Sequence, residues 1–152
     1  PVQEKLDAEA TALIGDFVLS IMRADHVFAS LSAELPFESG KGTAGPRLYA
    51  ALLVAICSNE ARGKPIGMKE AAAETGVDFA TTMPKYVKLA TDAGHIMRYD
   101  HPTDKRRVML RPSKRVMRMF EEQMPAIARI ASKLQDLKAG DVAKLRDMLN
   151  AQ

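Results

Sequence analysis

Both ends of the chain carry apolar residues at the spacing of long amphipathic helices. In residues 4–35 they lie three, four or seven positions apart, which places them on one face of a single helix. Residues 113–138 carry a second such stripe, with Pro125 inside it, where a kink is expected. A small globule cannot bury helices of this length. We therefore expect each to pack on another long helix, which can come from the same chain or from a second one.

Two shorter helices are predicted after a loop. Residues 36–46 contain three glycines and two prolines and predict the loop. Residues 47–61 are strongly apolar and predict a helix in the core. Residues 68–75 are rich in alanine and predict a short helix, which Gly76 should end in a left-handed backbone conformation.

A further helix is predicted over residues 81–92. Pro84 lacks a backbone N–H and would disrupt a helix interior, but the first turn tolerates it because N–H groups there have no intrahelical partner. We therefore expect Thr81 to cap this helix and Gly94 to end it.

The remaining elements are two strands and a last helix. Residues 95–100 and 106–110 alternate well enough to predict strands, and the HPTDK segment between them has proline and aspartate where a turn favours them. In this basic hairpin Arg106 and Arg107 begin the second strand, so their side chains should point to opposite faces. Residues 141–150 predict a final short helix.

The order of these elements predicts a mainly α fold with one small β-hairpin. The 152 residues suit one compact subunit, and 47% apolar with 27% charged residues is ordinary for a folded protein. No apolar run is long enough for a membrane helix, and the acidic N-terminal residues do not look like a secretion signal. We therefore expect a cytoplasmic protein without a membrane partner.

Positive charge is concentrated in one segment. The formal net charge is +3, but residues 85–118 carry +7, whereas residues 1–84 carry −4 and residues 119–152 are neutral. A local cluster of this size is enough to hold a DNA duplex, because each phosphate contacted by a cation releases counterions. Charge alone leaves open the alternative of a solvated basic surface with no partner.

Residues 66–111 resemble the winged helix-turn-helix of the MarR/SlyA family of bacterial transcription regulators. The best matching pieces are Gly-His-Ile at residues 94–96, before the first wing strand, and HPTDKRR at the wing. The Asp-x-Arg of the family's wing falls on Asp104 and Arg106. The long flanking helices also match, since in this family the first helix and the last two build a dimer.

The resemblance implies a single subunit over residues 1–152. Residues 1–35 and 113–152 would be its dimerisation helices, and residues 47–111 its DNA-binding lobe. It further implies a homodimeric regulator, most often a repressor, that binds a pseudo-palindromic operator with half-sites about one DNA turn apart. In this family a small effector bound between the dimer arm and the lobe changes that spacing, and a small aromatic or apolar molecule is the expected class.

The helix over residues 81–92 is the candidate reading helix of the major groove. Its exposed first part offers Thr81 and Thr82, which can contact bases or phosphates, and Lys85 and Lys88, which can reach phosphate or guanine. For Thr81, a purely structural role as helix cap is an equal alternative to base contact.

The wing supplies the other candidate contacts. The resemblance assigns Arg106 to the minor groove, where arginine is attracted by groove width, with Asp104 holding its guanidinium through a bidentate pair. Lys105 and Arg98 would flank the phosphates, and Arg107 belongs to the same cluster. The alternative for any one arginine is a surface ion pair of little energetic value.

Other chemistry is not indicated. Cys57 lies in an apolar stretch, which favours core packing over a redox role, and the three histidines lack metal-ligand spacing, so no metal or cofactor is expected. No phosphate loop, nucleophile elbow or zinc motif is present, which argues against an enzyme. A module that binds DNA without reading bases, or binds proteins, is the alternative to a regulator.

Overall fold

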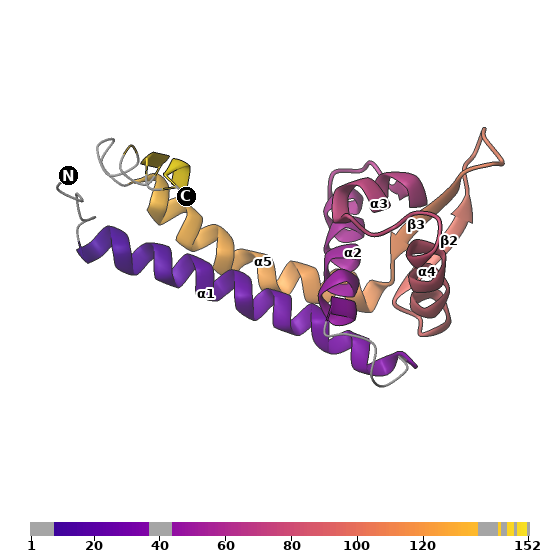
Figure 1. Ribbon diagram of the computed structural model, residues 1–152, viewed down its shortest axis with the longest axis horizontal. Coiled ribbons are helices and arrows are strands. Elements are labelled where there is room, and N and C mark those ends of the chain that lie inside the picture. The colour runs from indigo at the N-terminus through magenta and orange to yellow at the C-terminus, as the bar shows by residue number, and fades with distance from the viewer. Residues whose placement is uncertain (1–7, 37–43, 137–142, 144–145, 148, 152) are drawn as a thin grey trace. The chain divides into compact units, whose positions relative to one another are not determined.

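The computed structural model describes residues 8–36, 44–136, 143, 146–147 and 149–151. The five longer helices and two of the three strands are labelled in Figure 1. The chain divides into two compact units, which we call the helical unit, residues 1–24 and 123–152, and the central unit, residues 25–122.

The helical unit contains the first part of helix α1, Ala8–Ser30, and the last part of helix α5, Lys114–Gln135. Both helices continue into the central unit. Helix α5 is unbroken through Pro125. Residues 143, 146–147 and 149–150 of the last predicted helix are helical, and the rest of that helix lies outside the described residues, as do residues 1–7 and 137–138.

The N-terminal α-helix ends earlier than predicted, and a 3₁₀ turn, η1 (Leu31–Glu34), follows it. The hydroxyls of Ser30 and Ser32 each donate a 2.6 Å hydrogen bond to the carbonyl three residues earlier, which competes with the regular helical ladder. Leu35 is extended, as expected for a residue before proline.

Helix α2, Ala44–Ala61, supplies the centre of the core and begins three residues before the predicted start. Pro46 lies in its first turn, where the missing N–H costs no hydrogen bond. The largest fully buried side chains on this helix are Tyr49, Leu52, Leu53 and Ile56.

Helices α3, Met68–Thr75, and α4, Thr82–Asp92, agree with the prediction to within a residue. Gly76 ends α3 with φ of +74°, and Gly94 follows α4 with φ of +76°. Both glycines therefore have the left-handed backbone that the sequence predicted for the first of them.

A three-stranded antiparallel sheet replaces the predicted two-stranded hairpin. Strand β1, Ile66–Gly67, pairs with β3, Val108–Pro112, which also pairs with β2, Ile96–Asp100. Sequence periodicity missed β1 because two residues cannot show alternation. A Cβ at Gly67 would lie 2.7 Å from Glu70 Oε2 on α3 and 3.2 Å from the Val108 carbonyl oxygen on β3. Any larger residue at position 67 would therefore require these neighbours to shift.

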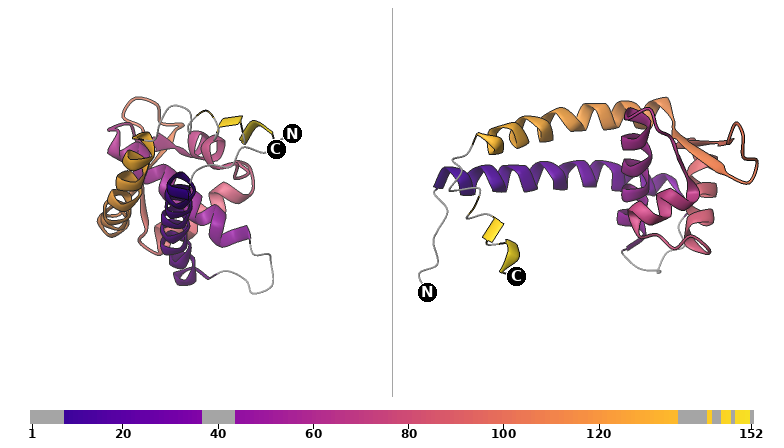
Figure 2. Two further views of the ribbon diagram at one scale, coloured as in Figure 1. Left: turned by 90° about the vertical axis from the view of Figure 1, so that its left-hand side faces the viewer. Right: turned by 90° about the horizontal axis from the view of Figure 1, so that it is seen from above.

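The second hairpin strand begins at Val108, so the expectation that Arg106 and Arg107 start a strand is wrong. Hydrogen bonds within the loop over residues 101–107 hold it out of the ladder: the Arg107 N–H donates to the Asp104 carbonyl at 3.0 Å, and the His101 N–H donates to the Arg107 carbonyl at 3.1 Å. This loop projects beyond β2 and β3 in Figures 1 and 2.

Ser113 caps the start of helix α5, because its hydroxyl accepts a hydrogen bond from the Val116 N–H at 3.2 Å. In the part of the chain that the structure describes, no helix is both long enough and apolar enough to cross a membrane.

Candidate nucleic-acid interface

The start of α4 is fixed by Asp78 rather than by a threonine cap. The Asp78 carboxylate accepts hydrogen bonds from the backbone N–H groups of Ala80 and Thr81, at 2.8 and 2.9 Å. The Thr81 hydroxyl donates to the same carboxylate at 3.1 Å, so Thr81 holds the N-cap position without capping the helix through its side chain. These hydrogen bonds lower the pKa of Asp78.

Helix α4 buries one face and exposes the other. Met83, Tyr86, Val87 and Ala90 are buried. The predicted contact residues lie on the remaining surface: Thr81, Lys85 and Lys88 are exposed, and Thr82 is half-buried. Lys88 forms a 2.6 Å ion pair with Asp92, one helical turn further along.

The loop over residues 101–107 places Lys105 and Arg106 in solvent, but it does not contain the expected pair between Asp104 and the Arg106 guanidinium. Instead, the Asp104 carboxylate accepts a 3.1 Å hydrogen bond from the Arg106 backbone N–H. The acid thus shapes the turn and leaves the arginine side chain unconstrained. The short loop explains the difference, because a turn brings Asp104 first to the nearby backbone N–H.

Acids from earlier in the chain neutralise part of the basic segment. Arg107 pairs with Glu70, Arg111 with Glu60, and Arg115 with Glu34. The pKa values of the Arg111 and Arg115 guanidinium groups are raised, chiefly by the hydrogen bonds to these carboxylates. The sequence could not reveal these pairs, since their members are 37 to 81 residues apart.

The other cations of this segment have no acid within ion-pair distance among the residues that the structure describes. Two of these six cations, Lys114 and Arg118, lie on α5. The other four lie on α4, the sheet and the loop: Lys85, Arg98, Lys105 and Arg106. All four side chains are exposed. They therefore form a set of charges available to a polyanion, which we call the free cations.

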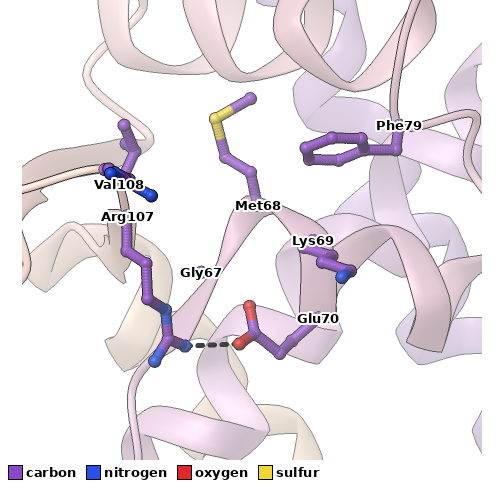
Figure 3. Close-up of a pocket in the computed structure, with 8 residues that line it drawn as sticks. Gly67, Met68, Lys69, Glu70, Phe79, Arg107 and Val108 are labelled. Atoms are coloured by element: carbon purple, nitrogen blue, oxygen red, sulfur yellow. Dashed lines mark hydrogen bonds and ion pairs between the residues drawn. The ribbon is translucent and has the colours of Figure 1, made fainter. Parts of the chain in front are cut away.

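A hollow of about 450 Å³ lies between α3 and the loop. Its walls are residues 67–70 around the start of α3, Phe79 shortly before α4, and residues 106–108 leading into β3. In Figure 3, Met68 and Phe79 stand at one end and the Glu70–Arg107 ion pair at the other. Phe79 is 51% exposed, which is unusual for a large aromatic side chain.

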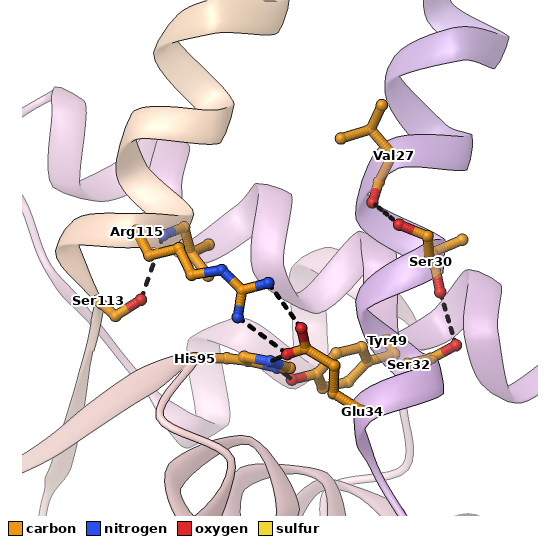
Figure 4. A network of polar contacts seen from close by, with 10 residues as sticks. Val27, Ser30, Ser32, Glu34, Tyr49, His95, Ser113 and Arg115 are labelled. Carbon is orange, nitrogen blue, oxygen red and sulfur yellow. Dashed lines mark hydrogen bonds and ion pairs between the residues drawn. The ribbon is translucent and has the colours of Figure 1, made fainter.

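A polar network inside the central unit joins η1, α2, the start of α5 and the turn before β2 (Figure 4). His95 is fully buried; its Nε2 lies 2.5 Å from the Glu34 carboxylate, and its Nδ1 contacts the Tyr49 hydroxyl. Because a carboxylate only accepts, Nε2 donates to Glu34. Arg115 completes the network with two hydrogen bonds to Glu34, at 3.0 and 2.6 Å.

These contacts perturb the acids of the network. Hydrogen bonds from Arg115 and His95 lower the pKa of Glu34 from 4.5 to about 2, and burial raises the pKa of Tyr49. Sequence reasoning missed this network. The one indication of it in the sequence was His95, a polar residue between Gly94, which ends a helix, and Ile96, which is expected in the core.

Cys57 is buried, and burial raises the pKa of its thiol to about 12, so core packing is confirmed for this residue. Over the described residues, no three His, Cys, Asp or Glu side chains gather as a metal site would need.

Comparisons with known proteins support the fold and not a close relationship. No family model matches the sequence, and no curated protein matches it. Among solved structures, NadR in complex with 4-hydroxyphenylacetate superposes with a TM-score of 0.51 at 15% identity, covering 99% of this chain and 96% of its own. RV1404 from Mycobacterium tuberculosis gives 0.50 at 18% identity, covering 97% and 91%.

E. coli MarR in complex with operator DNA is also similar, with a TM-score of 0.47 and 19% identity over 97% of this chain and 98% of that one. The structural neighbours are thus MarR-family and other transcriptional regulators. The chain has the MarR-type winged-helix fold.

In this MarR-type fold, α3 and α4 are the helix-turn-helix, and β2, β3 and the loop over residues 101–107 are the wing. The free cations therefore lie on the second helix of the helix-turn-helix, the first wing strand and the wing loop. All belong to the central unit.

Proposed function

We propose that the protein is a homodimeric, sequence-specific transcriptional regulator, acting as a repressor on DNA in the cytoplasm. It acts by binding and not by catalysis. Helix α4 enters the major groove of each operator half-site, and the wing loop enters the adjacent minor groove.

The observation that carries this proposal is the position of the free cations. Lys85 on α4, Arg98 on β2 and Lys105 with Arg106 on the wing loop are exposed and lack acidic partners among the described residues, while neighbouring basic residues are ion-paired. Unpaired cations on both DNA-facing parts of a winged helix fit phosphate and groove contacts.

Within this proposal each predicted residue has a role. Thr81, Thr82 and Lys85 contact base edges or phosphates, and Arg106 enters the narrow minor groove, where the potential is most negative. Lys105 and Arg98 contact flanking phosphates. Asp104 shapes the wing turn from its backbone hydrogen bond.

Two further residues are ion-paired in the free protein. Lys88 can reach phosphate only by giving up its pair with Asp92, and Arg107 only by giving up Glu70. We therefore assign both a smaller share of the binding energy than the four free cations.

Dimer formation is supported by exposed apolar side chains on α1. Val18, Leu19, Ile21 and Met22 are all more than two-fifths exposed on one stretch of this helix, and covering them with a second copy removes apolar surface from water. A two-fold dimer would present two reading helices about 34–36 Å apart, one turn of DNA.

Release from DNA would follow binding of a small aromatic or apolar effector. NadR, the solved structure with 4-hydroxyphenylacetate, shares the fold and supports this class of ligand. The effector would release DNA if it bound more tightly to a dimer conformation whose two reading helices are wrongly spaced for the operator, because binding would then shift the dimer toward that conformation.

The test is selection of bound sequences from a random duplex pool, followed by a comparison of the selected duplex with a scrambled one. A regulator should bind the selected duplex at least a thousandfold more tightly, roughly the lower bound for specific recognition. Equal affinities for both duplexes would replace the regulator with an architectural DNA-binding module. Repeating the selection with small aromatic acids present tests the effector.

A further inference from the structure

We propose that the hollow between α3 and the wing is a seat for the sugar–phosphate backbone of duplex DNA, with Lys69 and Phe79 as contact residues. This inference rests on the proposed function and adds two contact residues, Lys69 and Phe79, that the sequence analysis did not predict. The occupant is one strand of the duplex and not a base.

The geometry of B-DNA requires a backbone at this place. The major and minor grooves are separated by one sugar–phosphate strand, so a protein with a helix in one groove and a wing in the next must let that strand pass between them. The hollow is bordered by the wing loop and by the segment that leads into α4. One wall is Phe79, three residues before α4 begins, and the opposite wall includes Arg106 of the wing loop.

The charges in the hollow suit an anion. Lys69 is exposed and has no acidic partner among the described residues, and Arg106 is one of the free cations. Glu70 would repel a phosphate, but its charge is compensated by the ion pair with Arg107. The hollow thus offers two uncompensated cations and one neutralised pair.

The apolar wall suits a deoxyribose. Phe79 is 51% exposed and stands with Met68 at one end of the hollow (Figure 3). The sugar ring is the apolar part of the backbone, and packing it on Phe79 would cover aromatic surface that now faces water. Gly67 also lines the hollow, and a Cβ there would lie 2.7 Å from the Glu70 carboxylate, whose side chain would have to move.

The test measures binding of the full chain to selected and scrambled duplexes across a salt titration. Lys69→Gln should lower the slope of log K against log salt by about 1 on both duplexes, because one phosphate contact is lost. Phe79→Ala should weaken binding severalfold on both duplexes and leave the slope unchanged, because it removes a contact without charge.

Two matched variants serve as controls. Lys64→Gln removes an exposed lysine outside the hollow, and Met97→Ala removes a side chain that is also 51% exposed, on β2. Neither should change the slope or the affinity by as much. Circular dichroism of every variant verifies that the fold is intact.

An unchanged slope for Lys69→Gln on both duplexes would overturn the proposal. Weakening by Phe79→Ala on the selected duplex alone would also overturn it, because Phe79 would then read bases. Binding of benzoate that is lost in Phe79→Ala, with an unchanged Lys69→Gln slope, would assign the hollow to a small acid. If the wild-type chain binds both duplexes equally, the regulator proposal fails, and the slope on either duplex still decides the backbone seat.

Discussion

At the scale of single residues, the structure separates basic side chains that are available from those already engaged. Arg106 and Arg107 are adjacent in sequence, yet only Arg107 is ion-paired, to Glu70. Sequence reasoning placed both on a strand and could not distinguish them, because the partner acid is 37 residues away. Their expected contributions to DNA binding therefore differ.

We expect Arg106→Ala to weaken binding to the selected duplex by about 1–3 kcal/mol, since it removes the minor-groove contact. Fluorescence anisotropy on labelled duplex measures the affinity. Arg118→Ala, which removes an exposed arginine of α5 that has no ion pair among the described residues, is the control. An Arg106→Ala affinity equal to wild type, with the control also unchanged, would refute the assigned role.

Glu34 makes the free energy of unfolding depend on pH. Its pKa is lowered from 4.5 to about 2 in the folded protein, so the carboxylate's contribution is complete above pH 4.5 and is lost as the pH falls toward about 2. Glu34 is 40% exposed, and solvent screening keeps the effect modest. Thermal melts over this pH range should show a steeper decline for wild type than for Glu34→Gln. Parallel declines would contradict the prediction.

At the scale of elements, α4 shows how one side chain positions a helix. The predicted cap was Thr81, but the Asp78 carboxylate accepts two backbone N–H groups and the Thr81 hydroxyl. Both residues precede the helix by a few positions, and sequence preference for caps does not choose between them. Whether the Asp78 carboxylate or the Thr81 hydroxyl accepts these N–H groups depends on the conformation of the loop between α3 and α4.

We expect Asp78→Ala to lower the urea midpoint of unfolding and to weaken DNA binding, because the start of the reading helix loses its acceptor. Thr81→Val should have a smaller effect on the midpoint, since it removes a single hydroxyl hydrogen bond. Equal midpoints for wild type and Asp78→Ala would show that the loop holds its conformation without the carboxylate.

At the scale of the whole molecule, the two compact units have different expected tasks. The central unit carries the candidate DNA contacts, and the helical unit carries the exposed apolar stretch of α1. The predicted division into dimerisation helices and a DNA-binding lobe remains a prediction, because a single chain does not display its dimer.

We expect Met22→Glu to convert the dimer to a monomer, because Met22 is 62% exposed on α1 and a buried unpaired carboxylate is costly at an interface. Sedimentation velocity measures the change, and affinity for a two-half-site duplex should fall with it. Met97→Glu, at an exposed methionine of β2, should stay dimeric. A dimeric Met22→Glu would place the interface elsewhere.

The sequence by itself determined the helices, the hairpin, the two glycine turns and the buried Cys57, because hydrophobic period and backbone restriction act over a few neighbouring residues. It also identified the basic segment. Strand β1, the Glu34–His95–Tyr49–Arg115 network and the pairing of Arg107 with Glu70 became apparent only in the folded chain. Those contacts depend on which distant segments the folded chain brings within hydrogen-bond distance, which local pattern does not encode.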